Sequence, residues 1–404
     1  MSSRPRPPVT VLVVDDSPFM RLTIQRILGQ DPGIKVLDTA RDGLEGIEKL
    51  QALKPQVLTM DVEMPVMDGL RALEEIMRWQ PTAVIILSAV TTEGAEATIK
   101  AFDLGAFDVV AKPAGGPGGD LAALRRDLVD KVKAAAGVDP ARLAKHRAGS
   151  AAVSHPALRS ALPGDHASAV PLATASRPVG QNSGHPGHSS GRLPAGGNAS
   201  QRPAGSQAYP RHPVEIVAIG TSTGGPAALQ AVLPQLPVNF PVPVLVAQHM
   251  PPGFTGPLAQ RLNGLCALTV REAVHGETLR PGTIYIAPAG KQLRVQRKAE
   301  QLVVDIGDEA PIATLYRPSV DVMFLSLAQE VGRGTLGVIM TGMGSDGVRG
   351  AKELKALEAF AIAEAEETCV VYGMPRALVE ARLADRVVPL PEIGRTIVEC
   401  VMRG

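Results

Sequence analysis

The sequence predicts an α/β protein with an N-terminal doubly wound (βα)5 domain, a flexible linker, and a C-terminal doubly wound α/β domain with a mainly parallel sheet. Short β-branched runs alternate with helical patterns up to residue 136 and again from residue 213. Between them, residues 137–212 contain no Ile, Phe, Met, Trp or Cys and are rich in Pro, Gly and Ser. We therefore expect domains at 1–136 and 213–404, with a linker at 137–212.

The overall composition indicates a chain without a nucleic-acid or membrane-binding character. Its 404 residues are 45% hydrophobic and carry a formal net charge of +1, which suggests two or three globular domains. No run approaches the roughly 18 apolar residues of a spanning helix, and the N-terminus has no apolar signal core. We expect a cytoplasmic protein that neither inserts into membranes nor binds nucleic acid.

The cysteines are expected to be reduced and mostly buried. Cys266, Cys369 and Cys400 have no metal-ligand spacing. The alternative of a lone reactive thiol at Cys369 stays open.

In the first domain, five strands are expected at Val11–Val14, Lys35–Leu37, Val57–Met60, Val84–Leu87 and Asp108–Ala111. Polar side chains follow four of these strands, namely Asp15, Asp16, Asp61, Ser88 and Lys112. The carboxyl ends of parallel strands form the ligand crevice of such a sheet. Three carboxylates there would repel one another unless a divalent cation bound, so we expect Mg2+ and a phosphoryl group on Asp61. The alternative for each residue taken singly is a surface helix cap.

The linker is expected to be flexible and mildly basic, because it cannot bury a core. Histidines are scattered along it, among them His155, His166, His185 and His188. A metal-binding tract is the alternative interpretation, but no fixed ligand spacing recurs among them.

In the second domain, strands are expected at Ile216–Ile219, Val244–Ala247, Leu268–Val270, Thr283–Ala287, Leu302–Ile306, Leu336–Met340 and Ala361–Ala363. Helical patterns lie between them, at Thr255–Leu262, Val320–Val331 and Val348–Leu357. The alternation again predicts an α/β layer structure.

The first strand of this domain breaks at Thr221-Ser-Thr-Gly-Gly-Pro226 and continues as a helix. Such a turn lifts a side chain off the sheet edge beside the unpaired N–H groups of the helix, which makes Ser222 the candidate nucleophile. A glycine turn that only connects the two elements, or that binds a phosphate, is the alternative. A dinucleotide fingerprint fits poorly, because it requires glycine at the position of Ser222.

Two further strand ends carry residues that complete this chemistry. One strand ends at His249, and another ends in a glycine loop that contains Asp346. In a parallel sheet all three turns share one edge, where His249 could accept the proton of Ser222 and Asp346 could orient the imidazole. A structural histidine and an aspartate that binds its own loop are the alternatives for each residue alone.

The first domain resembles the response-regulator receiver family through Val13–Met20, Met60–Pro65 and Ala111–Pro113. The resemblance implies phosphorylation of Asp61 by a histidine kinase. It also implies a Mg2+ site with Asp16, Asp61 and the Glu63 carbonyl as direct ligands and Asp15 through water. Ser88 and Lys112 match the receiver switch residues. Val109 departs from the family, where an aromatic residue is common.

The second domain resembles the catalytic domain of chemotaxis protein-glutamate methylesterases and glutamine deamidases. The motifs are Ile219–Pro226, Gln248–Phe254, Tyr285–Pro288, Met340–Gly347 and Cys369–Pro375. The resemblance implies a Ser222, His249 and Asp346 triad, an oxyanion hole from the backbone N–H groups of Thr223 and Met343, and no cofactor for ester hydrolysis. The implied substrates are methyl-accepting chemoreceptors, and the implied control is phosphorylation of the receiver. Ser345 replaces a common Asn, and the linker is longer than the family usually has.

Two other classes of protein are alternatives to this hydrolase. A DNA-binding regulator would need a basic recognition helix, whereas the C-terminal region carries acidic residues at Glu353, Glu358, Glu364, Glu366 and Glu367. A receiver-linked signalling scaffold with a non-catalytic second domain would be favoured by the loss of a triad residue. The sequence retains all three residues, so the hydrolase is preferred.

Overall fold

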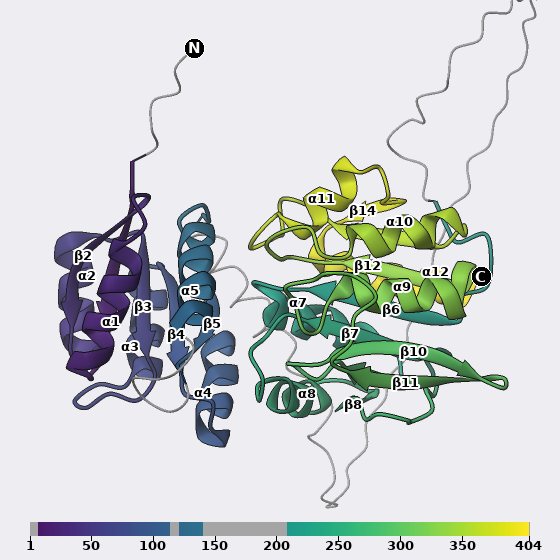
Figure 1. Ribbon diagram of the computed structural model, residues 1–404, viewed down its shortest axis with the longest axis horizontal. Helices are drawn as coiled ribbons and strands as arrows, with labels where there is room; N and C mark the ends of the chain where they lie inside the picture. The colour runs from purple at the N-terminus through teal and green to yellow at the C-terminus, as the bar shows by residue number, and fades with distance from the viewer. Residues whose placement is uncertain (1–6, 114–120, 140–207, 404) are drawn as a thin grey trace, which may run out of the picture. The chain divides into compact units, whose positions relative to one another are not determined.

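The computed structural model describes residues 7–113, 121–139 and 208–403 (Figure 1). Its first domain contains one parallel sheet with the strand order β2-β1-β3-β4-β5. The strands are β1 (Val9–Val14), β2 (Ile34–Ala40), β3 (Val57–Asp61), β4 (Ala83–Ser88) and β5 (Asp108–Ala111). The predicted (βα)5 fold is confirmed. Because β2 and β3 flank β1 on opposite sides, the order reverses there and opens a crevice at the carboxyl ends of the strands.

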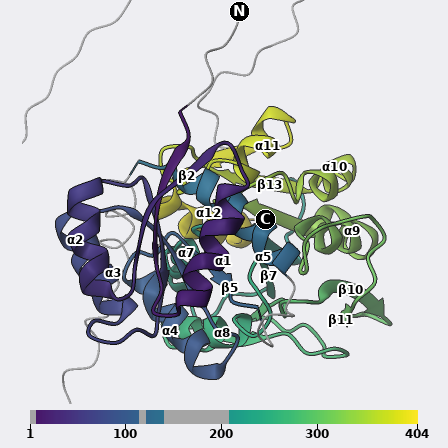
Figure 2. The ribbon, with the colours of Figure 1, turned by 60° about the vertical axis from the view of Figure 1, so that its left-hand side comes forward.

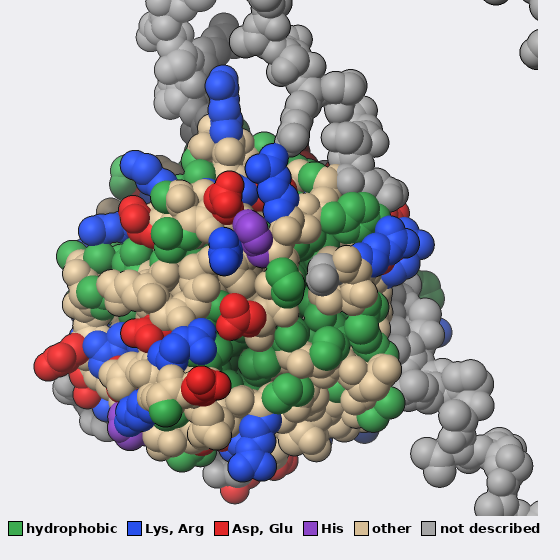
Figure 3. Space-filling view, turned by 90° about the vertical axis from the view of Figure 1, so that its right-hand side faces the viewer, with side chains coloured by type: hydrophobic (Ala, Val, Ile, Leu, Met, Phe, Trp, Pro, Cys, Tyr) green, Lys and Arg blue, Asp and Glu red, His purple; other side chains and the backbone are tan. Residues whose placement is uncertain are grey.

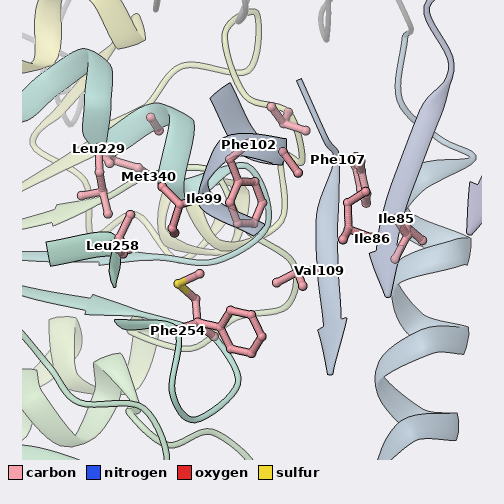
Figure 4. Packing of buried hydrophobic residues seen from close by; sticks show 14 of the residues in the cluster. Ile85, Ile86, Ile99, Phe102, Phe107, Val109, Leu229, Phe254, Leu258 and Met340 are labelled. Atoms are coloured by element: carbon pink, nitrogen blue, oxygen red, sulfur yellow. The ribbon is translucent and has the colours of Figure 1, made fainter. Parts of the chain in front are cut away.

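Helices cover both faces of this sheet, as Figures 1 and 2 show. Helix α1 packs with α5 on one face, while α2 packs with α3 and α3 with α4 on the other. Their bounds are α1 (Pro18–Gly29), α2 (Gly43–Leu53), α3 (Gly69–Trp79), α4 (Thr92–Asp103) and α5 (Leu121–Ala135). The first four begin at polar caps whose side chains accept a backbone N–H, at Ser17, Asp42, Asp68 and Thr91. Buried side chains of β4 and β5 line the core between the layers, among them Ile85, Ile86 and Val109 (Figure 4).

Residues 140–207, which make up most of the predicted linker, lie outside the described residues. His155, His166, His185 and His188 also lie there, so their alternative role as a metal tract stays a prediction. The boundaries proposed at residues 136 and 212 stay predictions as well.

The second domain is built on a seven-stranded sheet with the order β14-β13-β12-β6-β7-β9-β8, in which every pair is parallel. Its strands are β6 (Ile216–Thr221), β7 (Val244–Gln248), β8 (Thr269–Glu272), β9 (Thr283–Ile286), β12 (Thr335–Ile339), β13 (Phe360–Glu364) and β14 (Arg386–Val388). The predicted parallel sheet is confirmed, although β14 was not expected.

Alternate residues of β6 point to opposite faces of this sheet. Val217 and Ile219 join a core with α7, α8 and α12, whereas Ile216 and Ala218 join a core with α9, α10 and α11. Leu229 of α7 and Leu258 of α8 belong to the first of these cores (Figure 4). The helices are α7 (Gly225–Val232), α8 (Thr255–Asn263), α9 (Val320–Glu330), α10 (Val348–Ala356), α11 (Met374–Glu380) and α12 (Leu390–Arg403), with short 3-10 turns at η2 (Leu233–Gln235) and η3 (Gly332–Gly334).

The strand expected at Leu302–Ile306 exists, but it does not belong to the parallel sheet. It lies in β11 (Gln301–Gly307), which pairs antiparallel with β10 (Gln292–Lys298) in a separate two-stranded sheet. On the face drawn in Figure 3, Lys and Arg side chains lie among Asp and Glu side chains, so that face has no continuous basic patch. Among the described residues, no helix combines the length and the apolar character that crossing a membrane requires.

The cysteines are free thiols, as expected. Cys369 and Cys400 are buried and Cys266 is half-buried. Burial raises the pKa of Cys266 to about 12 and that of Cys400 to about 11. Cys369 is fully enclosed, which disfavours a reactive role because a reactive thiol must be accessible.

Candidate functional site

The strand order places the three predicted triad residues at one switch point of the second sheet. Strand β6 lies between β7 and β12. Ser222 directly follows β6 and His249 directly follows β7, while Asp346 lies in the loop between β12 and α10. The carboxyl ends of these three neighbouring strands meet at one edge, where open α/β sheets bind ligands.

The turn after β6 holds Ser222 at the start of α7. The Ser222 carbonyl accepts the N–H of Gly225 at 2.8 Å and the side-chain amide of Gln248 at 2.9 Å. Gly224 has a φ of +77°, which favours glycine, and a Cβ on Gly225 would collide with the Gln248 side chain. The two glycines therefore let the chain reverse tightly enough to leave the partly exposed Ser222 at the edge.

His249 and Asp346 form a hydrogen-bonded pair. His249 Nε2 lies 2.8 Å from Asp346 Oδ2, and both side chains are almost fully buried. Since a carboxylate only accepts, Nε2 carries the proton, and in a neutral imidazole Nδ1 then holds the lone pair. Within the described residues Nδ1 is buried without a hydrogen-bond partner. The nitrogen that is free to act as a base is thus Nδ1.

Asp346 is held as a carboxylate by the first turn of α9. Its Oδ1 accepts from the Ser319 hydroxyl at 2.9 Å and the Asp321 N–H at 3.0 Å, and its Oδ2 accepts the Val320 N–H at 2.7 Å. Burial acts to raise the pKa of Asp346, but the hydrogen bonds from His249 and the α9 backbone outweigh it and lower the pKa. The positive end of the helix dipole favours the same charged state.

A second carboxylate, that of Asp321, caps the start of α10 in the same way that Asp346 caps the start of α9. Asp321, in the first turn of α9, accepts the N–H groups of Gly347 at 3.0 Å and Gly350 at 2.8 Å, at the start of α10. Burial, with the nearby Asp346 charge, raises the pKa of Asp321 to about 6. Each helix is therefore capped by a carboxylate from the other segment, which fixes the Asp346 loop relative to α9.

Tyr316 is a site residue that sequence reasoning missed. Its ring stacks on the His249 imidazole with centroids 4.1 Å apart and planes 6° apart. The Tyr316 carbonyl accepts the side-chain amide of Gln292 at 2.8 Å, which anchors the loop before α9. Tyr316 stands in an irregular loop with no periodic pattern, so nothing in the sequence indicated this contact.

The candidate oxyanion donors lie on two segments that approach each other closely. A Cβ on Gly342 would lie only 2.8 Å from Ser222 Cβ, so the loop after β12 passes directly beside the serine. No described residue accepts a hydrogen bond from the backbone N–H of Thr223 or of Met343. Thr223 follows Ser222 in sequence, and Met343 follows the Gly342 position that lies beside Ser222. No hydrogen bond joins the Ser222 hydroxyl to His249 within the described residues.

The first domain gathers the predicted acidic cluster at its own switch point. Asp15, Asp16 and Asp61 each offer a carboxylate oxygen, and these oxygens lie within 4.8 Å of one another. Lys112 Nζ lies 2.9 Å from Asp15 and 2.6 Å from Asp61. Burial raises the pKa of Asp15, although Lys112 opposes this effect. Burial acts to lower the pKa of Lys112, but the two carboxylates outweigh it and raise the pKa.

The remaining receiver residues lie around this cluster. Glu63 is exposed in the loop after β3, where a groove of about 630 Å³ is lined by Asp16, Glu63 and Met64 among others. The buried Ser88 hydroxyl donates to the Gly94 carbonyl at 3.0 Å. Val109 is buried in β5. The structure thus places every predicted receiver residue at or next to the crevice, with the Ser88 hydroxyl bonded to α4.

Fold and site together define a class: a receiver domain joined to an α/β domain that brings a serine, a histidine and an aspartate to one edge of its sheet. Residues 11–118 match the model of the response regulator receiver domain, and residues 217–397 match that of the CheB methylesterase. A protein-glutamate methylesterase/protein-glutamine glutaminase of Desulfitobacterium hafniense (strain Y51) is 64% identical over 406 residues, covering 99% of this chain and 100% of that protein. The chain therefore belongs to the protein-glutamate methylesterase/protein-glutamine glutaminase family.

Other relatives cover the chain similarly or in part. A protein of the same description from Moorella thermoacetica (strain ATCC 39073 / JCM 9320) is 46% identical over 420 residues, covering 98% of each chain. The crystal structure of the CheB methylesterase catalytic domain of Thermotoga maritima is 43% identical, covers 46% of this chain and 98% of that chain, and has a TM-score of 0.45.

Proposed function

We propose that this chain hydrolyses glutamate methyl esters on chemoreceptors and deamidates particular receptor glutamines, with Ser222, His249 and Asp346 as its catalytic triad. The observation that carries the assignment of roles is the buried His249–Asp346 pair, which leaves Nδ1 without a partner among the described residues, while the His249 N–H donates to the carbonyl of Thr221, next to Ser222. The names of the relatives support the substrate chemistry. The receiver-linked scaffold is disfavoured, because a non-catalytic domain has no need of this arrangement.

Each step of the proposed reaction is carried out by a named group of the site. His249 Nδ1 accepts the Ser222 proton as the hydroxyl oxygen attacks the ester carbonyl carbon. The free N–H groups of Thr223 and Met343 stabilise the resulting oxyanion, and the buried Asp346 carboxylate stabilises the imidazolium. The imidazolium then gives its proton to the departing methoxide, which leaves as methanol. Water, activated by the same nitrogen, releases the glutamate from Ser222. Deamidation follows the same steps with ammonia as the leaving group.

The receiver crevice supports phosphorylation of Asp61 by a histidine kinase. The oxygen ligands of Asp15, Asp16 and Asp61 fit Mg2+, which prefers carboxylate and water oxygens, and the Glu63 carbonyl would complete the protein ligands. When bound, Mg2+ would offset the negative charge of the carboxylates and the phosphoryl group. Lys112 would pair with a phosphoryl oxygen, and Ser88 would turn from Gly94 toward it.

Release of methanol from methylated receptor membranes tests this function. The whole chain should release methanol, and acetyl phosphate with Mg2+ should raise the rate. The Asp61→Asn variant should keep the basal rate and lose the response. Absence of methanol release from the whole chain under both conditions would favour the scaffold instead.

A further inference from the structure

A fully buried carboxylate lies behind the candidate active site and takes no part in the mechanism described above. Glu364 ends β13, the strand next to β12, and none of its surface is exposed. Its Oε2 accepts the Thr341 N–H at 2.8 Å, and its Oε1 accepts the Thr368 hydroxyl at 3.0 Å. Burial raises the pKa of Glu364 to about 7, against the opposing effect of these hydrogen bonds. A carboxyl group at such a position needs a reason, because burying one without benefit is costly.

Thr341, whose N–H donates to Glu364, is hydrogen-bonded to the turn that carries Ser222. The Thr341 carbonyl accepts the N–H of Ser222 at 3.0 Å. The Thr341 hydroxyl donates to the Thr223 carbonyl at 3.0 Å and accepts the Val371 N–H at 3.0 Å. Thr341 is itself fully buried. Its position therefore fixes the backbone of the nucleophile and of the residue that carries one oxyanion donor.

The second candidate oxyanion donor, the N–H of Met343, lies two residues after Thr341 in the same segment. Gly342 follows Thr341, and its N–H donates to the Val371 carbonyl at 3.0 Å. The Gly342 carbonyl accepts the N–H groups of Gly373 at 3.1 Å and Met374 at 2.8 Å. These bonds clamp the segment immediately before Met343. A shift of Thr341 would move both donors relative to Ser222.

We propose that Glu364 is a positioning residue that sets the geometry of the oxyanion hole through the backbone of Thr341. The inference rests on the proposed function, since it concerns the same reaction. It assigns Glu364 no contact with the substrate. Since oxyanion donors act only on charge that develops in the transition state, displacing them should lower kcat and leave KM nearly unchanged.

Glu364→Ala and Glu364→Gln separate this role from a general loss of stability. The alanine variant leaves the Thr341 N–H unpaired, whereas glutamine keeps a carbonyl oxygen for that N–H and an amide that can donate to Thr368. We expect kcat for methanol release to fall about 10- to 100-fold in Glu364→Ala, below the ~10²–10³ for complete loss of a donor. Glu364→Gln should restore kcat to within about threefold, and KM should change less than about twofold in both.

Ser326→Ala is the matched control. The buried Ser326 hydroxyl accepts the Val295 N–H at 3.0 Å, between α9 and β10, so its removal also orphans a backbone donor. Its kcat should stay near that of the wild type, with rates expressed per active site counted by a serine-directed fluorophosphonate. If Glu364→Ala retains kcat within about threefold, or if Ser326→Ala loses as much, the positioning role is wrong.

A Thr341→Val variant and the rate of Ser222 phosphonylation give two further tests of the positioning role. Should Glu364→Ala fail to fold, Thr341→Val removes the bond to the Thr223 carbonyl, and an unchanged kcat would overturn the inference. The rate of Ser222 phosphonylation by the fluorophosphonate also depends on the oxyanion hole but needs no receptor. Slower phosphonylation in the variants would support the positioning role even if the wild type released no methanol, an outcome that would count only against the proposed substrate.

Discussion

Replacing Asp346 by asparagine removes one charge from a site built to hold a carboxylate. Four donors surround its two oxygens: the His249 ring nitrogen and the Val320 N–H at Oδ2, and the Ser319 hydroxyl and the Asp321 N–H at Oδ1. An asparagine has one oxygen and one NH2 group, so two of these donors must face another donor. The variant is isosteric, which leaves packing intact while the hydrogen bonding changes.

The side-chain amide of the Asp346→Asn variant can take two orientations, and each loses an interaction that the carboxylate makes. With NH2 toward α9, Ser319 can rotate its hydroxyl to accept, but the buried Asp321 N–H is left unpaired at a cost of about 1–3 kcal/mol. With NH2 toward His249, the imidazole must move its proton to Nδ1, which removes the base. Both orientations lose the charge that stabilises the imidazolium. We therefore expect kcat to fall on the order of 10³- to 10⁴-fold.

Asp321→Asn provides the matched control at the neighbouring carboxylate. The Gly347 and Gly350 N–H groups both donate to Asp321 Oδ1, so the amide oxygen can keep both bonds. Its kcat for methanol release should stay within about threefold of the wild type. An Asp346→Asn variant within tenfold of the wild type, or equal losses in the two variants, would refute the assigned role of Asp346.

Three further predictions concern other parts of the molecule. Asp61→Asn should abolish phosphoryl incorporation from labelled acetyl phosphate because it removes the acceptor carboxylate, and excess chelator should abolish it in the wild type because the carboxylates then repel the donor. Label on another residue, or labelling in excess chelator, would contradict this. Tyr316→Ala should lower kcat about threefold to tenfold, as expected for losing an aromatic contact of about 0.5–1.5 kcal/mol, whereas Tyr316→Phe should keep the stack and the rate. Equal kcat values for the two variants would count against a role of the stacked ring. Burial raises the pKa of Glu364 from 4.5 to about 7, so between these pH values the folded state binds more protons than the unfolded state and stability falls as pH rises. Urea unfolding of the wild type should show that the free energy of unfolding falls by at most about 3 kcal/mol between pH 4.5 and pH 8, a fall that Glu364→Gln lacks. The same pH dependence in both proteins would exclude a raised pKa of Glu364.

The positions of the candidate site residues could be predicted because each follows a strand. Ser222, His249 and Asp346 come after buried apolar runs, and a parallel sheet brings such ends together. The same rule located Asp61 and Lys112 in the first domain. Strand ends are local sequence features, so they can be recognised without knowing the tertiary contacts.

What the sequence could not predict depends on side chains from distant loops. The choice of His249 Nε2 as the donor to Asp346, the stacking of Tyr316, and the link from Glu364 to Thr341 all depend on how separate loops pack. The pairing of β11 with β10 was missed for a related reason. Strand β10 contains only two apolar residues among charged and polar ones, Leu293 and Val295, so its strand pattern is weak.

The central claim is that Ser222 is the nucleophile of a methylesterase, and methanol release from methylated receptor membranes by Ser222→Ala tests it most directly. Ser345→Ala is the matched control, because Ser345 is an exposed serine in the nearby loop before Asp346. We predict that Ser345→Ala keeps a rate near that of the wild type, while Ser222→Ala loses activity by several orders of magnitude, on the order of 10³-fold or more. Methanol release by Ser222→Ala at a rate within tenfold of the wild type would contradict the claim.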